Sequence, residues 1–102
     1  MNQEQLWDTP PPWTVTRQGT LVEIRRGGRT VCSNDQHNVM HASCYAAGAA
    51  ACIAKLTRQS PYVARYWSYD RMPRGARAAH NAWRHGFDVA EVLMKEYDST
   101  QP

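Results

Sequence analysis

The residue types best suited to binding chemistry gather between Pro61 and Arg74. In this segment aromatic and arginine side chains alternate: Tyr62, Arg65, Tyr66, Trp67, Tyr69, Arg71 and Arg74. A guanidinium group binds phosphate or carboxylate with paired hydrogen bonds, and Trp, Tyr and Arg dominate the hot spots of protein interfaces. The same combination stacks on bases and contacts phosphates in single-stranded nucleic acid. The segment indicates a contact surface, while two or three of the rings could equally fill a core that has a single Phe.

A run of basic residues follows at the start of the predicted C-terminal helix. Arg74, Arg77 and Arg84 are spaced by three and seven residues, which places them on one side of a helix. The basic residues begin this helix and Glu91, Glu96 and Asp98 end it, which is the reverse of what the helix dipole favours. We therefore expect a partner-binding surface made of Arg65, Tyr66, Trp67, Tyr69, Arg71, Arg74, Arg77 and Arg84. The alternative is a solvated face in which Asp70 and Asp88 neutralise the arginines.

Two further groups of residues give weaker signals. Arg25, Arg26 and Arg29 crowd the tip of a predicted hairpin and form a candidate secondary basic patch, although basic tips are common on exposed hairpins. Cys32, His37, His41 and Cys44 have zinc-ligand types, but their C-x4-H-x3-H-x2-C spacing matches no common zinc finger. Helix caps and ordinary packing explain these four residues better than a zinc site does, so we expect no metal and no cofactor.

Catalytic signatures are scarce in this chain. It has no nucleophile elbow and no phosphate-binding loop, and Cys44 with His41 is as compatible with a structural role as with a nucleophile and its base. We therefore expect a protein that is not an enzyme.

The N-terminal third predicts strands. Residues 1–12 form a proline-rich arm, since three consecutive prolines prevent a helix or a central strand. Residues 13–32 alternate in polarity and are interrupted at Gln18-Gly19 and Gly27-Gly28, which predicts a three-stranded antiparallel meander. With turns at these positions Val15 would face Val22, Trp13 would face Ile24, and Ile24 would face Val31.

The remainder predicts helices. Apolar residues recur at helical spacing over 39–58 and again over 74–98, and Ser60-Pro61 and Met72-Pro73 separate these helices from a short helix or ordered loop at 62–71. The Ala46–Ala51 run has little side-chain bulk, so the second main helix should approach the first one there. Strands followed by helices predict an α+β fold in a single domain, 1–102, whose helical part spans 39–98.

Composition limits the class and the location of the protein. The chain has 102 residues and a net charge of +3, but residues 17–84 contain eleven of its twelve Lys and Arg and only three of its nine acids. No apolar stretch is long enough to span a membrane, and the first twelve residues lack the order of a signal peptide. Three cysteines without a framework spacing indicate reduced thiols. These features predict a cytoplasmic protein without a membrane partner.

Three short motifs in the second half resemble the ribosome modulation factor family and its phage-encoded relatives. They are the small residues Ala46–Ala51 around Gly48, the pair Pro61-Tyr62, and the run Ala82-Trp83-Arg84-His85-Gly86-Phe87. The resemblance covers about 50 residues, and both the strands and the long segment between Tyr62 and Trp83 have no counterpart in that family. It implies a small basic protein that docks on ribosomal RNA, with Tyr62, Trp83, Gly86 and Phe87 building a helical pair and arginines meeting phosphate.

The whole chain also resembles the small accessory proteins of bacteriophages and prophages, many of which inhibit host machines. The leading expectation is therefore a phage-type inhibitor or modulator, of the anti-CRISPR or anti-defence type, acting in the host bacterial cytoplasm. It would dock its Arg and aromatic residues on a bacterial protein or ribonucleoprotein complex. A direct RNA- or ribosome-binding modulator and a small zinc-binding module are the alternatives, and the sequence leaves the oligomeric state open.

Overall fold

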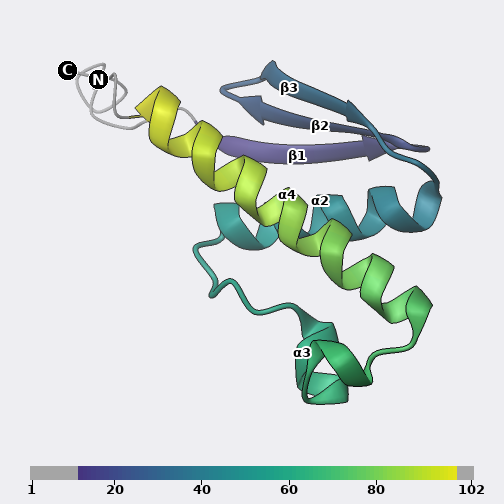
Figure 1. The fold of residues 1–102 in the computed structure, drawn as a ribbon. Helices are drawn as coiled ribbons and strands as arrows, with labels where there is room; N and C mark the ends of the chain where they lie inside the picture. Colours follow the sequence, from purple (N-terminus) through teal and green to yellow (C-terminus); the bar gives the residue numbers. More distant parts are fainter. Residues whose placement is uncertain (1–11, 99–102) are drawn as a thin grey trace, which may run out of the picture.

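A computed structural model describes residues 12–98 of the chain, which form an α+β fold (Figure 1). A three-stranded antiparallel sheet in the order β1-β2-β3 precedes the helices. The elements are β1 (Trp13–Gln18), β2 (Leu21–Arg26), β3 (Arg29–Asp35), α2 (Val39–Ile53), α3 (Pro61–Tyr66), the 3-10 helix η1 (Tyr69–Arg71) and α4 (Arg74–Asp98). Apart from Pro12, the predicted proline-rich arm lies outside the described residues.

The meander is confirmed, but its predicted register is wrong in both hairpins. The first turn is Gly19-Thr20, so Val15 pairs with Ile24 and Trp13 with Arg26. This differs from the expected pairing by two positions, which keeps each side chain on its predicted face of the pleated strand.

The second turn does lie at Gly27-Gly28, where φ values of 61° and 84° suit glycine. A bulge between Ile24 and Arg25 then makes Ile24 pair with Cys32 instead of Val31. Strand β3 also continues to Asp35, three residues beyond the predicted end of the sheet.

Helix α2 begins where expected and ends five residues early. The side chain of Asn38 accepts a hydrogen bond from the His41 amide at 2.8 Å and caps the first turn. The last turn is closed by two backbone hydrogen bonds, in which the Lys55 amide donates to the Cys52 carbonyl and the Leu56 amide donates to the Ala51 carbonyl, both at 2.9 Å. This is a Schellman ending with Lys55 at a φ of 62°, a position that usually holds glycine, and the apolar spacing gave no sign of it.

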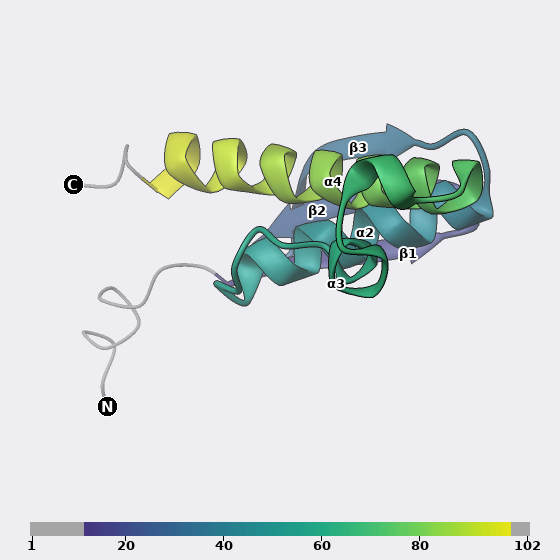
Figure 2. The same cartoon turned by 60° about the horizontal axis from the view of Figure 1, so that its bottom comes forward.

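Both main helices lie on the same side of the sheet, with α4 crossing α2 (Figures 1 and 2). Their closest approach occurs at two glycines. A Cβ on Gly48 would lie 1.9 Å from the Trp83 carbonyl oxygen, and a Cβ on Gly86 would lie 2.0 Å from that of Tyr45. The small-residue run therefore admits the second helix as predicted, and each helix contributes one glycine to the crossing.

The core lies between the sheet and this helical pair. Val22 and Ile24 from β2, Tyr45 and Ala49 from α2, and Ala90 from α4 are fully buried. The end of α4 is fastened to the sheet, since Asp98 accepts hydrogen bonds from Trp13 Nε1 and Arg26 Nε, each at 3.1 Å. None of the helices in residues 12–98 combines the length and apolar character needed to cross a membrane.

Candidate partner-binding site

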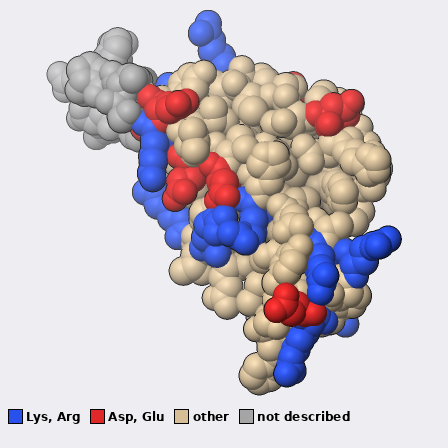
Figure 3. All heavy atoms as spheres, in the orientation of Figure 1, with Lys and Arg blue, Asp and Glu red and all other residues tan. Residues whose placement is uncertain are grey.

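The predicted contact residues occupy one end of the molecule, formed by α3, η1 and the first half of α4 (Figure 1). We call this region the Arg/aromatic surface; it comprises Arg65, Tyr66, Trp67, Tyr69, Arg71, Arg74, Arg77 and Arg84. Figure 3 shows basic side chains projecting around this end of the molecule. Between Pro61 and Arg84 the chain has a single acidic residue, Asp70. Most of the positive charge at this end therefore has no local acidic counterpart in the sequence.

Helix α3 is fastened to α2 by a buried polar contact. The Tyr62 hydroxyl lies 3.3 Å from Cys44 Sγ, which in turn contacts Met40 Sδ at 3.8 Å. The hydrogen bond with Cys44, followed by burial, raises the pKa of Tyr62 to about 12. Tyr62 is therefore an uncharged anchor that fixes the start of α3, and its ring belongs to the packing of the helices.

A second anchor joins the segment before α3 to α4. Ser60 Oγ lies 2.6 Å from His80 Nδ1, and the two residues are only 1% and 5% exposed. Burial, and next the nearby charges of Arg84 and Arg58, lower the pKa of His80. A neutral imidazole therefore holds the connecting segment against α4 at neutral pH.

The short helix η1 is held by Arg77 and Asn81 from α4. Arg77 donates to the carbonyl oxygens of Tyr69 at 3.2 Å and Asp70 at 2.8 Å, and its guanidinium lies 5.2 Å from the centre of the Tyr69 ring. Asn81 donates to the Tyr69 hydroxyl at 3.2 Å. Arg77 therefore positions the surface, and the predicted outward stripe of Arg74, Arg77 and Arg84 is interrupted in its middle.

Trp67 has the most exposed large hydrophobic side chain of residues 12–98, with 83% of its area accessible. It directly follows α3, and its amide closes the helix by donating to the Val63 carbonyl at 2.7 Å. This position has a φ of 73°, in the region that L-residues with side chains rarely adopt. The backbone geometry thus directs a large indole ring into solvent at a conformational cost.

The surface arginines differ in how their charge is used. Arg65 lies over the Tyr66 ring, with its guanidinium carbon 5.7 Å from the ring centre. Arg71, Arg74 and Arg84 make no ion pair with any acidic residue in the described part of the chain. Asp88, the predicted neutralising partner, binds Arg58 at 2.5 and 2.7 Å. This contact lowers the pKa of Asp88, and the nearby charge of Arg84 acts in the same direction. The solvated alternative therefore keeps Asp88 near Arg84, while Arg71 and Arg74 make no ion pair in the described residues.

The hairpin tip does not present three free cations. Arg26 has a side chain only 14% exposed and pairs with Asp98, while Arg25 contacts Glu23 at 3.9 Å and the Gly28 carbonyl. Within residues 12–98 only Arg29 of this candidate patch has no such contact. The predicted secondary patch thus contains one arginine that fastens the sheet to α4, one that braces its own hairpin, and one exposed cation.

The four candidate zinc ligands do not form a cluster. Cys44 contacts Tyr62, Cys32 accepts a hydrogen bond from Asn34 Nδ2 at 3.2 Å, and the rings of His37 and His41 lie 5.7 Å apart. No group of three or more His, Cys, Asp or Glu side chains among the described residues could hold a metal ion. The zinc alternative therefore has no geometric support in this part of the chain.

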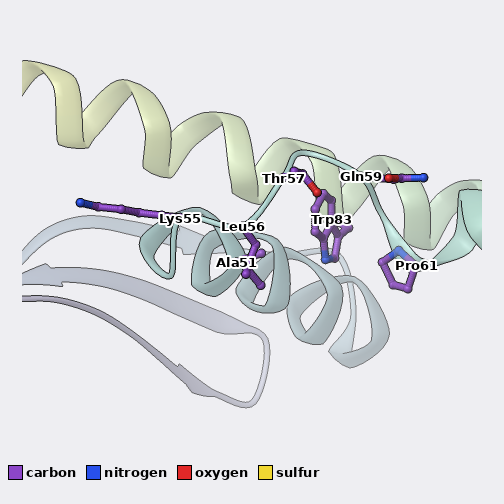
Figure 4. Close-up of a pocket in the computed structure, with 7 residues that line it drawn as sticks. All are labelled: Ala51, Lys55, Leu56, Thr57, Gln59, Pro61 and Trp83. Carbon is purple, nitrogen blue, oxygen red and sulfur yellow. The ribbon is translucent and has the colours of Figure 1, made fainter.

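A pocket of about 580 Å³ opens between the end of α2, the segment leading to α3, and α4 (Figure 4). Its lining residues are Ala51, Lys55, Leu56, Thr57, Gln59, Pro61 and Trp83.

Ser60 and His80 have the residue types of a nucleophile and its base, but Ser60 is 1% exposed and no carboxylate in the described residues hydrogen-bonds His80. We assign this pair the anchoring role described above.

The sequence predicted a set of candidate contact residues, most of which are exposed, but it did not reveal the residues that position them. Asn81 holds η1 through Tyr69, and the contact between Ser60 and His80 holds the segment before α3. Ser60 and His80 are 20 residues apart in the sequence, and no short pattern predicts that they meet. No protein-family model, curated protein or solved structure matches this chain.

Proposed function

We propose that this protein is a non-enzymatic binding protein that docks its Arg/aromatic surface on a bacterial nucleoprotein machine and thereby inhibits or modulates it. An inhibitor of the phage-encoded anti-CRISPR or anti-defence type, acting in the host cytoplasm, is its most concrete form. The observation that carries the proposal is the occurrence, at one end of the molecule, of an 83% exposed Trp67 and of Arg71 and Arg74, which make no ion pair in residues 12–98.

The arrangement has the two properties of a binding hot spot. The exposed aromatic and guanidinium groups supply contact area and directed hydrogen bonds. The groups behind them are held in place, because Arg77, Asn81, His80 and Ser60 are all engaged in hydrogen bonds within the protein. A surface held in this way loses little conformational entropy when it binds, which favours affinity.

A pull-down tests the proposal. Tagged wild-type protein and the double variant Arg71→Ala/Arg74→Ala are incubated with bacterial lysate, with and without nuclease, and the bound material is identified by mass spectrometry. The matched control is Arg17→Ala/Lys95→Ala, which removes the same charge from exposed positions outside the Arg/aromatic surface. We expect a nucleoprotein complex to be retained by wild type and the control and lost from the surface variant. Equal retention by all three proteins would contradict the proposal.

A direct RNA- or ribosome-binding modulator is the second candidate. It is supported by the location of the residues that resemble the ribosome modulation factor family. Gly48 and Gly86 lie at the helix crossing, and Trp83 and Phe87 are buried beside each other with their ring centres 5.5 Å apart. These are the roles that the resemblance implies. Binding of purified ribosomes with a steep salt dependence would favour this candidate, and retention of a purely proteinaceous complex after nuclease treatment would disfavour it.

A further inference from the structure

We propose that Trp67 is a stacking platform for an unpaired base, and that the neighbouring arginines Arg65, Arg71 and Arg74 contact the adjoining phosphates. The anionic component bound by the Arg/aromatic surface is then single-stranded nucleic acid. This inference rests on the proposed function and specifies its ligand.

The first observation is the freedom of the indole ring. Trp67 is 83% exposed, and it makes no ring–ring, cation–π or hydrogen-bonding contact through its side chain with any described residue. Tyr69, in contrast, is tied to Arg77, Asn81 and His80, with its ring centre 5.6 Å from that of His80. Stacking requires an accessible ring face, and such a face is sequence-tolerant because every base has one.

The second observation is the backbone that presents this ring. A φ of 73° is unfavourable in free energy for a residue that has a side chain, but not for glycine. Strained conformations of this kind cluster at functional sites, where the surrounding structure over-determines them. Here the Trp67 amide is held by the Val63 carbonyl at 2.7 Å, while the next element, η1, is held by Arg77. The ring is therefore supported from both sides of the chain without being covered.

The third observation is the charge around the ring. Arg65, Arg71 and Arg74 are exposed, and Asp70 is the single acid in the segment that contains them. Guanidinium groups bind phosphate oxygens with paired hydrogen bonds, and a polyanion releases counterions when it binds several of them. An aromatic platform among cations matches the alternating bases and phosphates of an unpaired strand.

The surroundings of Trp67 favour nucleic acid over a protein partner. The fully buried core of a protein interface is largely apolar. Among the large hydrophobic residues of 12–98 that are exposed, only Tyr69 belongs to the same α3–η1 segment as Trp67. The others lie on α2, on the segment after it, or on the C-terminal half of α4: Val39, Met40, Leu56, Val92 and Tyr97. Exposed rings among arginines provide a stacking site and not a broad apolar patch.

The test measures binding of fluorescently labelled oligonucleotides by anisotropy. The probes are oligouridylate and oligothymidylate of about 12 nucleotides, which is within the usual site sizes of single-strand binders. A blunt DNA duplex of the same length is the third probe. The two single strands distinguish RNA from DNA as the source of the ligand, and the duplex controls for attraction to phosphate alone. Wild type is compared with Trp67→Gly, Trp67→Phe and Arg71→Ala/Arg74→Ala.

Trp67→Gly is a suitable variant because glycine suits the backbone at this position. We expect it to weaken single-strand binding roughly 10- to 100-fold, the range for loss of one stacked base. Trp67→Phe should restore much of the affinity, and duplex binding should be weaker than single-strand binding and insensitive to Trp67→Gly. Arg71→Ala/Arg74→Ala should weaken binding and reduce its salt dependence, whereas Arg17→Ala/Lys95→Ala should have a smaller effect.

Equal affinity of wild type and Trp67→Gly for the single strands would overturn the inference, and so would tighter binding of the duplex. The pull-down is also repeated with Trp67→Gly. If it yields a complex that wild type retains and Trp67→Gly loses, while no oligonucleotide binds, the partner is a protein. In that case the inference fails and the proposed function stands. If the pull-down yields nothing that depends on the surface arginines, the proposed function fails whatever the oligonucleotides do.

Discussion

The crossing of α2 and α4 and the Arg/aromatic surface contain similar residue types but use them in opposite ways. At the crossing, Gly48 and Gly86 bring two backbones together, and Trp83 and Phe87 are buried in the core. At the surface, Trp67 extends into solvent from a position that would suit glycine. At the crossing, glycine allows the two helices to pack closely. At the surface, a tryptophan occupies a position that suits glycine, and its ring is exposed. The backbone environment of each tryptophan in this chain therefore decides whether its ring stabilises the fold or is available to a partner.

The largest expected effect comes from adding a methyl group at the crossing. Gly86→Ala would place a Cβ 2.0 Å from the Tyr45 carbonyl oxygen, so the two helices must separate. We expect the free energy of unfolding to fall by about 3 kcal/mol, at the upper end of the usual range for overpacking. Urea denaturation followed by circular dichroism measures the change.

Gly75→Ala is the matched control, because the added Cβ would meet no atom within 4 Å at this position in the same helix. Alanine is the better helix former, so this variant should be unchanged or more stable by up to about 1 kcal/mol. A loss below about 1 kcal/mol for Gly86→Ala would mean that the two helices do not approach as closely as described.

The second prediction compares the two aspartates that fasten α4. Asp98→Ala removes the partner of Trp13 Nε1 and leaves the Arg26 guanidinium, 14% exposed, without its carboxylate. We expect a loss of about 1–3 kcal/mol in the free energy of unfolding. Asp88→Ala breaks an ion pair whose side chains are 38% and 44% exposed, so its cost should stay below about 1 kcal/mol. The same denaturation experiment separates the two, and equal losses would contradict this ranking.

The contrast between the two regions also explains what the sequence could predict. The strands, the long α4 and the close approach at Ala46–Ala51 follow from periodicity and side-chain size, which are local properties. The predicted register of the sheet is wrong because the turn at Gly19-Thr20 and the bulge after Ile24 are decided by backbone geometry, which residue types alone do not specify. The early end of α2 was missed because Lys55 takes a glycine-like conformation.

For the candidate site, the exposed residues were predictable but their supports were not. Composition singled out Trp67 and the arginines around it. It did not reveal that Arg77 binds the carbonyls of η1, or that Ser60 and His80 meet across 20 residues of sequence. Such contacts depend on tertiary packing, which a single sequence does not encode in any short pattern.

The third prediction concerns pH and the support of the surface. The folded state lowers the pKa of His80 below its usual value of 6.5, mainly through burial. The unfolded chain therefore binds the proton more readily, and the stability contributed by neutral His80 is complete above pH 6.5 and declines as pH falls below it.

Thermal unfolding of wild type and His80→Asn at several pH values between about 5 and 8 measures this effect. Asparagine retains a polar group near Nδ1 but does not titrate, so its melting temperature should fall less below pH 6.5. Parallel pH profiles of the two proteins would show that His80 is not the responsible group.

The smallest expected effect separates strain from binding. Lys55 and Trp67 are the two non-glycine residues of 12–98 with positive φ, at 62° and 73°, and each follows a helix. Lys55→Gly and Trp67→Gly both relieve the backbone, while the added flexibility of the unfolded chain offsets part of the gain. We expect each to leave the free energy of unfolding unchanged or to raise it by up to about 1 kcal/mol. Only Trp67→Gly should weaken binding to single strands. If Lys55→Gly weakened it equally, the loss would come from altered backbone flexibility and the indole ring of Trp67 would not be the contact.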